Sequence, residues 1–154
     1  MKNKIKLILI IIFVIIIDQI VKNNVINNFS GTNLVLIKNL ITITNNSNTD
    51  TAYSLGANSI ILLMAVNIIV IYALAKILVT NYQKINDTLK TGICLIIAGE
   101  ASNLIDMIFK GYEIKIITIL KYKSFNLADV SIIIGFILIV LSILVEMVKS
   151  QEKQ

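Results

Sequence analysis

The chain of 154 residues contains no histidine, no proline and no tryptophan, and it has a single cysteine. Without histidine, no Ser-His or Cys-His nucleophile pair and no H-E-x-x-H zinc site can be built. A single cysteine, Cys94, excludes an internal disulfide framework and a thiolate metal cluster. Because Cys94 lies in an apolar stretch, we interpret it as a small buried side chain. We expect neither a cofactor nor a metal.

Apolar side chains, in contrast, are abundant. Hydrophobic residues make up 56% of the chain and charged residues 15%, and the mean hydropathy is +0.86. The hydrophobic share and the mean hydropathy exceed those of a soluble domain of average composition, and the charged share is below it. The composition therefore predicts a single membrane domain over residues 1–154, all-α and polytopic.

Four apolar segments have the length of membrane helices, which need about 20 residues to cross a hydrocarbon core of about 30 Å. We predict four transmembrane helices, at about residues 5–21, 60–79, 92–109 and 128–148. The first follows a basic stretch, as the apolar region of a secretory signal does. No A-x-A-like cleavage site follows it, so we interpret it as an uncleaved span rather than a cleaved signal.

Four spans place both termini on the same side of the membrane. Lysines gather in the segments on that side, which predicts that both termini are cytoplasmic: Lys2, Lys4, Lys6, Lys84, Lys90, Lys149 and Lys153. Four lysines in the opposite connection count against this orientation: Lys110, Lys115, Lys121 and Lys123.

Aspartates from three spans fall at one predicted depth, toward the outer leaflet. Asp18 lies about 20 Å along the first helix at 1.5 Å per residue. Asp106 falls in the last turn of the third span, and Asp129 in the first turn of the fourth. Ionisable groups at membrane depth are costly and tend to mark a functional site. The alternative is that Asp106 and Asp129 are ordinary helix-end residues in water.

A repeated Asn-x-x-Asp pattern favours the functional interpretation. Asn103 precedes Asp106 by three residues, and Asn126 precedes Asp129 by three, so each amide shares a helical face with its carboxyl. Two carboxyls in a partly dry site share a proton, so one acts as a base on water while the other acts as an acid. This chemistry needs neither histidine nor metal.

The outer connection, residues 24–57, contains a β-branched stretch from Leu34 to Thr44 that indicates a short strand or hairpin. Such a small extracytoplasmic β element could form a cradle that holds an extended substrate by strand addition. The alternative is an ordinary loop.

Four segments, DQIVK, NTDTAYS, GEASNLIDMIFKG and FNLADVSIIIG, occur in this order. They resemble the bacterial lipoprotein signal peptidases (signal peptidase II), and the resemblance covers nearly the whole chain. It implies an intramembrane aspartic endopeptidase of the bacterial cytoplasmic membrane, with its active site near the outer leaflet. Such an enzyme cuts the signal peptide from a prolipoprotein before the diacylglyceryl-modified cysteine. The implied partners are that prolipoprotein and membrane lipids, without nucleic acid, and we expect a monomer.

The resemblance implies a role for seven residues. The catalytic pair would be Asp106 and Asp129. Five further residues would support the site or bind substrate: Asn103, Asn126, Asn48, Asp18 and Lys22. The last two, four residues apart, are expected either to hold site and loop together or to form a structural ion pair.

Departures from the family pattern surround these residues. Asp50 stands where the outer-loop motif has glycine, and Glu100 places a charge within the third span. Met107 replaces an arginine, and Lys115 stands where the pattern has an aspartate shortly after Gly111. These changes motivate a second hypothesis, a catalytically impaired relative that binds lipopeptides or globomycin-type inhibitors as a decoy or resistance protein. A third, a proton-coupled carrier, lacks the interrupted helices and internal repeats typical of carriers.

Overall fold

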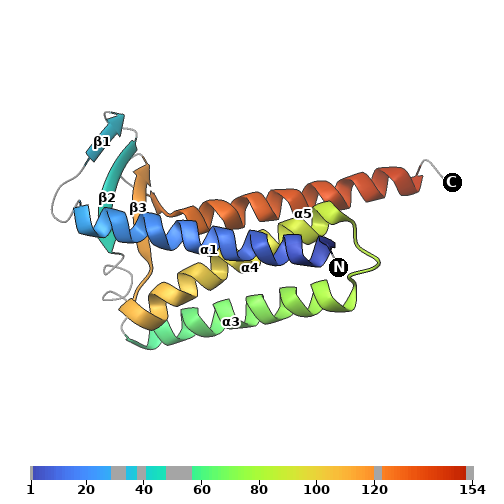
Figure 1. Cartoon of the computed structure of the whole chain (residues 1–154), viewed down its shortest axis with the longest axis horizontal. Helices are drawn as coiled ribbons and strands as arrows, with labels where there is room; N and C mark the ends of the chain where they lie inside the picture. The colour runs from blue at the N-terminus through green and yellow to red at the C-terminus, as the bar shows by residue number, and fades with distance from the viewer. Residues whose placement is uncertain (1, 29–33, 38–40, 48–56, 120–122, 152–154) are drawn as a thin grey trace.

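The computed structural model describes residues 2–28, 34–37, 41–47, 57–119 and 123–151. Its elements, in chain order, are α1 (Lys2–Asn28), β1 (Leu34–Ile37), β2 (Ile41–Ser47), α3 (Ala57–Thr80), α4 (Asp87–Lys110), β3 (Ile114–Ile119), β4 (Lys123–Phe125) and α5 (Leu127–Gln151). The predicted fold class, helical with a small β element, is confirmed (Figure 1). Asn48 and Asp50, expected in the outer-loop motif, lie outside the described residues.

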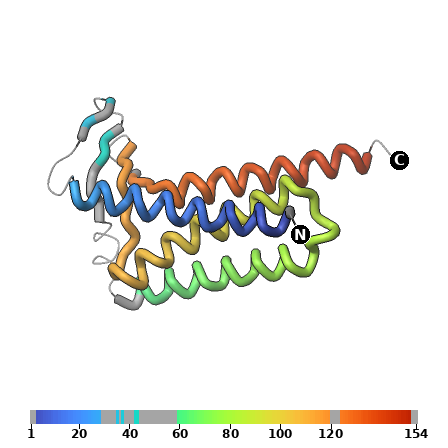
Figure 2. Tube along the Cα trace, in the orientation of Figure 1, coloured from blue at the N-terminus to red at the C-terminus, as the bar shows by residue number. Residues whose placement is uncertain are grey.

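The four long helices lie side by side, and the sheet covers one end of the bundle (Figures 1 and 2). α1 begins and α5 ends at the opposite end, where the connection between α3 and α4 also lies (Figure 1). α4 contacts each of the other three helices and is the most deeply buried of α3, α4 and α5. It is therefore the central helix of the bundle.

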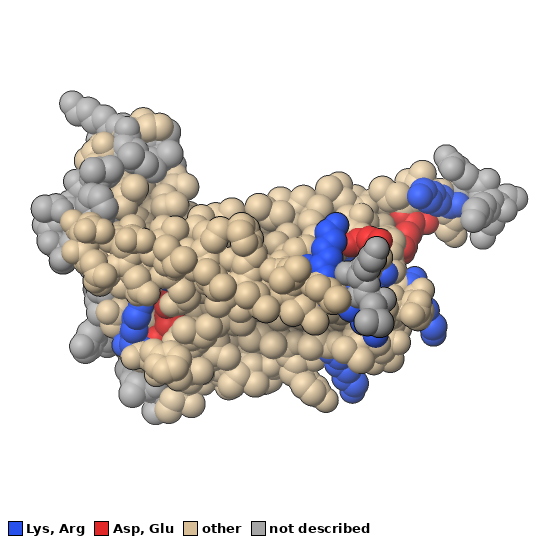
Figure 3. Space-filling model, in the orientation of Figure 1, with Lys and Arg blue, Asp and Glu red and all other residues tan. Residues whose placement is uncertain are grey.

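Within the described residues, three helices are long and apolar enough to cross a membrane: Ser59–Thr80, Asp87–Lys110 and Leu127–Gln151. The remaining predicted span, residues 5–21, lies within α1, which packs along α4. We treat α1 as the fourth span because Ile8, Leu9 and Phe13 expose more than half of their surface. Figure 3 shows a long tan surface, free of blue and red atoms, between the charged groups near the two ends of the molecule.

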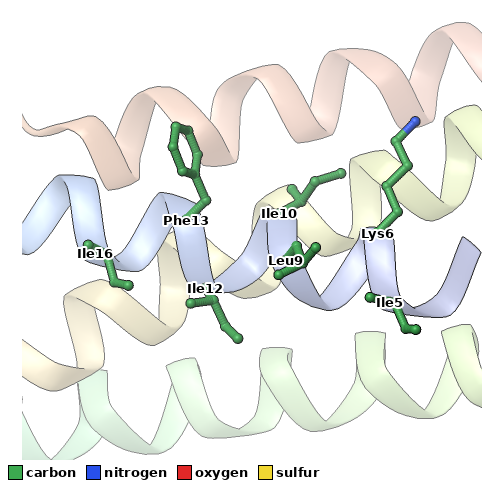
Figure 4. Close-up of a pocket in the computed structure, with 7 residues that line it drawn as sticks. All are labelled: Ile5, Lys6, Leu9, Ile10, Ile12, Phe13 and Ile16. Atoms are coloured by element: carbon green, nitrogen blue, oxygen red, sulfur yellow. The ribbon is translucent and has the colours of Figure 1, made fainter. Parts of the chain in front are cut away.

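An open apolar groove of about 650 Å³ runs along α1 from Ile5 to Ile16. Figure 4 shows its side chains, with Lys6 as the one charged group among aliphatic and aromatic neighbours. Leu9 and Phe13, which line the groove, are among the most exposed side chains of the helix. A surface of this composition suits lipid acyl chains.

Local sequence signals fix both ends of α4. The side chain of Asn86, its N-cap, accepts a hydrogen bond of 2.8 Å from the Leu89 N–H. At the other end, Gly111 adopts the left-handed conformation with φ of 77°, and its N–H donates to the Met107 carbonyl at 3.1 Å. Asp106 consequently lies in the last turn of the helix.

Glycines allow α4 and α5 to pack backbone against backbone. A Cβ added to Gly92 would lie 2.7 Å from the Gly135 carbonyl oxygen, and one on Gly135 would lie 2.6 Å from that of Gly92. One added to Gly99 would lie 2.5 Å from the Ala128 oxygen. Only glycine fits such approaches, as is typical of membrane helix interfaces.

α1 is longer than predicted, because it continues past residue 24 to Asn28. Val25 near its end is buried in an apolar cluster with Ile114 and Ile116 of β3. In addition, Asn28 donates a side-chain hydrogen bond of 2.9 Å to the Asn24 carbonyl. Packing against the sheet thus stabilises the helical conformation of a segment that we predicted to belong to the outer connection.

The sheet has four antiparallel strands in the order β1-β2-β3-β4. The strands β1 and β2 begin within the predicted strand region of the outer connection, and β2 extends past Thr44 to Ser47. β3 and β4, which follow α4, were not predicted. β3 carries Ile114 and Ile116 toward the end of α1, and Lys115 between them lies on the other side of the strand. The sheet therefore joins the two connections that cover the end of the bundle.

Candidate active site at the sheet end of the bundle

The start of α5 positions Asp129. The N–H of Asp129 donates to the Asn126 side-chain oxygen at 2.7 Å, and the N–H of Asn126 donates to Asp129 Oδ2 at 3.0 Å. This reciprocal pair is a capping box, with an asparagine at the N-cap and a carboxylate at N3. The spacing in FNLAD thus has a structural role, and it fixes the Asp129 carboxylate at a helix N-terminus, where negative charge is favoured.

Two asparagines connect α4, α5 and β3 around this carboxylate. Asn126 Nδ2 donates to Asn103 Oδ1 at 2.8 Å and to the Ile114 carbonyl at 3.0 Å. Asn103 Nδ2 in turn donates to Asp129 Oδ1 at 3.2 Å. Asn103 therefore donates a hydrogen bond to the aspartate of the neighbouring helix α5, whereas its sequence spacing predicted that it would lie beside Asp106.

Asp18, Lys22 and Asp106 form a fully buried ionic group between α1 and α4. Lys22 Nζ lies 2.5 Å from Asp18 Oδ2 and 2.6 Å from Asp106 Oδ2, and all three side chains have no exposed surface. Lys22 also donates to Asn103 Oδ1 at 3.3 Å. Asp18 and Lys22 form an ion pair, and Asp106 is the second carboxylate on the same cation.

Further donors complete this buried group. Ser102 Oγ donates to Asp18 Oδ2 at 2.6 Å, and the Ala128 N–H donates to Asp18 Oδ1 at 2.9 Å. Gln19 Nε2 donates to Asp106 Oδ1 at 3.0 Å. Gln19 and Ser102 were not predicted as site residues, although they lie in the segments DQIVK and GEASNLIDMIFKG, directly beside Asp18 and Asn103.

Lys115 is the immediate partner of Asp129. Its Nζ donates to both carboxylate oxygens, at 2.8 and 2.9 Å, and lies 2.7 Å from Glu113 Oε2. Burial by itself lowers the pKa of Lys115, but the charges of Glu113 and Asp129 and the hydrogen bonds to them outweigh burial and raise it above the ordinary lysine range. Lys115 is therefore a firmly protonated cation at this site.

Each of the two predicted catalytic carboxylates thus forms an ion pair with a different lysine. Asp106 is enclosed with Lys22, whereas Asp129 keeps 18% of its side-chain surface exposed beside Lys115. Asn103 lies between the two groups and contacts both Lys22 and Asp129. Among the residues that the structure describes, no group of three or more acidic or cysteine side chains is placed to hold a metal ion.

A family model described as signal peptidase (SPase) II matches residues 10–145 of the chain. The chain belongs to the signal peptidase II family. A lipoprotein signal peptidase of Staphylococcus aureus (strain JH9) is 29% identical over 152 residues, which cover 96% of this chain and 93% of that protein. The resemblance stated from the sequence segments is confirmed.

Solved structures support the same relationship. A bacterial membrane enzyme determined by the in meso method at 1.9 Å resolution matches with a TM-score of 0.80 and 28% identity, over 90% of this chain and 92% of that one. A second structure of such an enzyme, at 2.3 Å resolution, matches with a TM-score of 0.79 over 97% of this chain and 93% of that one. Membership of the signal peptidase II family supports cleavage of prolipoprotein signal peptides, and with the apolar helices it supports an integral cytoplasmic membrane protein.

Proposed function

We propose that the chain removes the signal peptide from diacylglyceryl-modified prolipoproteins, and that hydrolysis takes place at the carboxylate of Asp129. The observation that carries this proposal is the fixed and partly exposed Asp129, held by a capping box and by Asn103 in a segment that the family model covers. Once Lys115 moves off its two oxygens, a carboxylate held in this way can accept a proton from water.

The two-aspartate hypothesis gives Asp106 as the partner of Asp129. Asp106 is fully buried and bound by Lys22, Gln19 and, at 3.4 Å, the Ile114 N–H. To act on water with Asp129 it would have to leave Lys22. The geometry supports Asp106 more strongly as a positioning residue, because its cation Lys22 bonds Asn103, which bonds Asp129.

The same proposal includes the orientation and the assembly. The sheet and Asp129 lie toward the outer leaflet, both termini are cytoplasmic, and the chain acts as a monomer. Two of the four lysines that counted against this orientation are paired with acids at the sheet end: Lys110 with Asp106 at 3.9 Å, and Lys115 with Asp129. The positive-inside rule counts basic residues rather than net charge, and the first helix, which carries Lys2, Lys4 and Lys6 at its start, usually dominates it.

The test is a gel-shift cleavage assay with purified protein in lipid and a diacylglyceryl-modified prolipoprotein. Wild type is compared with Asp129→Asn and Asp106→Asn. We expect cleavage by wild type and none by Asp129→Asn. If Asp106→Asn loses cleavage while it keeps its thermal stability, Asp106 is a direct partner. If it loses both together, Asp106 is a positioning residue.

A second candidate function is supported by one observation, the bond of Lys115 to both oxygens of Asp129. A carboxylate neutralised in this way is a weak base. The chain would then bind lipopeptides or globomycin-type inhibitors without cutting, as a decoy or resistance protein. In the same assay, well-folded wild type that retains substrate but releases no signal peptide would favour this function.

A further inference from the structure

Glu113 lies directly before β3 and contacts the lysine that occupies the carboxylate of Asp129. Its Oε2 lies 2.7 Å from Lys115 Nζ, and the same nitrogen lies 2.8 and 2.9 Å from the two oxygens of Asp129. An ammonium group has three N–H donors, so these three contacts can use all of them. Lys115 is therefore shared between two carboxylates, and one of them is the proposed base.

The three side chains differ in their access to solvent. The exposed fraction is 9% for Lys115, 18% for Asp129 and 25% for Glu113. A nearly enclosed ammonium that has no carboxylate partner is strongly unfavourable. For Lys115 to leave Asp129, a second carboxylate must already be in contact with it. Among the described residues, Glu113 is the one other acid that forms an ion pair with Lys115.

The backbone between Glu113 and Lys115 is held in place. Ile114, which separates them, is fully buried, and its carbonyl accepts a hydrogen bond of 3.0 Å from Asn126 Nδ2. Glu113 and Lys115 are two residues apart, the spacing that places side chains on the same side of an extended chain. Because the backbone is fixed, Lys115 can move from one acid to the other by rotation of its flexible four-carbon stem.

Both groups keep partners when they separate. Among the interactions that raise the pKa of Lys115, the charge of Glu113 is the largest, ahead of the charge of Asp129. Asp129 in turn accepts hydrogen bonds from the Asn126 N–H at 3.0 Å and from Asn103 Nδ2 at 3.2 Å. Asp129 therefore stays fixed without Lys115, and Lys115 stays paired without Asp129.

We propose that Glu113 is a positioning residue of the hydrolytic site, which retains the ammonium of Lys115 while Asp129 accepts a proton from water. This inference rests on the proposed function. In the resting site Lys115 contacts both acids, and when substrate and water occupy the site it contacts Glu113 alone. The cation is never left without a carboxylate, which lowers the cost of releasing Asp129. Glu113 thereby determines how readily Asp129 becomes a base.

The test compares Glu113→Gln with Glu146→Gln, a matched change near the far end of α5, where Glu146 bonds Asn86 at 2.7 Å. Cleavage of a diacylglyceryl-modified prolipoprotein is followed at saturating substrate, and thermal unfolding in lipid shows that each variant is folded. We expect Glu113→Gln to cleave roughly 5-fold more slowly or worse, because a charged hydrogen-bond partner of Lys115 becomes a neutral one. Glu146→Gln should cleave like wild type.

A second background separates action through Lys115 from a structural role. In Lys115→Met no ammonium remains for Glu113 to retain, so the double variant with Glu113→Gln should cleave as fast as Lys115→Met alone. Residues that act through one contact are non-additive in this way, whereas independent effects add. Glu113→Asp keeps the charge on a shorter side chain and should lose less than Glu113→Gln. Its effect should also vanish in the Lys115→Met background, so it decides the question if Glu113→Gln does not fold.

The outcomes distinguish this inference from the proposed function. A wild-type rate for Glu113→Gln, with Asp129→Asn inactive, would overturn the role of Glu113 and leave the proposed function intact. An equal loss with and without Lys115 would also overturn it, because Glu113 would then act directly on the substrate or the fold. If wild type does not cleave, or Asp129→Asn cleaves like wild type, the proposed function fails and this inference fails with it.

Discussion

The ammonium of Lys22 lies between the carboxylates of Asp18 and Asp106, at 2.5 and 2.6 Å, with no exposed surface on any of the three side chains. Two negative charges and one positive charge are thus enclosed where α1 meets α4. Hydrogen bonds from Ser102 to Asp18 and from Gln19 to Asp106 also hold this group in place. It fixes the position of α1 along α4. Through the hydrogen bonds of Asn103 to Lys22 and Asp129, it also fixes the position of Asp129 along the bundle.

Lys22→Met is expected to lower the free energy of unfolding by about 3–5 kcal/mol, because it leaves two buried carboxylates without their cation. The control is Lys110→Met, which removes a partly exposed lysine 3.9 Å from Asp106 and should cost no more than about 1 kcal/mol. Unfolding in mixed detergent measures both. Equal losses for the two variants would contradict the central role of Lys22.

Gly99→Ala and Gly92→Ala each place a Cβ against a backbone oxygen of α5, at 2.5 and 2.7 Å. Both should lower thermal stability, because the helices must move apart to relieve the contact. Only Gly99 lies beside the first turn of α5, so only Gly99→Ala should also reduce cleavage beyond its effect on folding. Similar cleavage by the two variants would show that the contact at Gly99 does not position Asp129.

Lys115→Met should raise the cleavage rate several-fold, since it removes the cation that occupies both oxygens of Asp129. Lys115→Arg keeps the charge and should not raise it. The rates are compared at saturating prolipoprotein, so that differences in binding do not enter. A slower Lys115→Met enzyme would indicate that the cation assists the reaction rather than restrains it.

The raised pKa of Lys115 predicts a pH dependence at the alkaline end. A lysine in the unfolded chain titrates at about 10.4. Because the pKa of Lys115 in the folded protein lies above that value, its ion pairs stabilise the fold fully below about pH 10. This stabilisation is lost as the pH rises through the folded pKa. The difference in unfolding free energy between wild type and Lys115→Met should therefore shrink above about pH 10. A constant difference up to pH 12 would contradict the ion pair.

Hydropathy and spacing were sufficient to predict the helices and the common level of Asp18, Asp106 and Asp129. Strand β3 was missed, although IKIITI is β-branched, because it pairs with β2 from a distant connection. Helical spacing correctly placed Asn103 and Asp106 on neighbouring positions of one helix. It could not show that Asn103 bonds Asp129 on α5, since that choice depends on helix packing.

Lys115 illustrates the same limit. The sequence marked it as a departure from the family pattern, but its position depends on strand register, in which Lys115 pairs with Asn46 of β2. Only with that register in place does its side chain meet Asp129. Tertiary packing decided this partnership.

We propose that this member of the signal peptidase II family hydrolyses prolipoproteins at Asp129. The decisive measurement is mass spectrometry of a diacylglyceryl-modified prolipoprotein after incubation with wild type and with Asp129→Asn. We expect wild type to release an intact signal peptide, cut immediately before the modified cysteine, and Asp129→Asn to release none. Uncut substrate bound to folded wild-type protein, or equal release by both proteins, would contradict it.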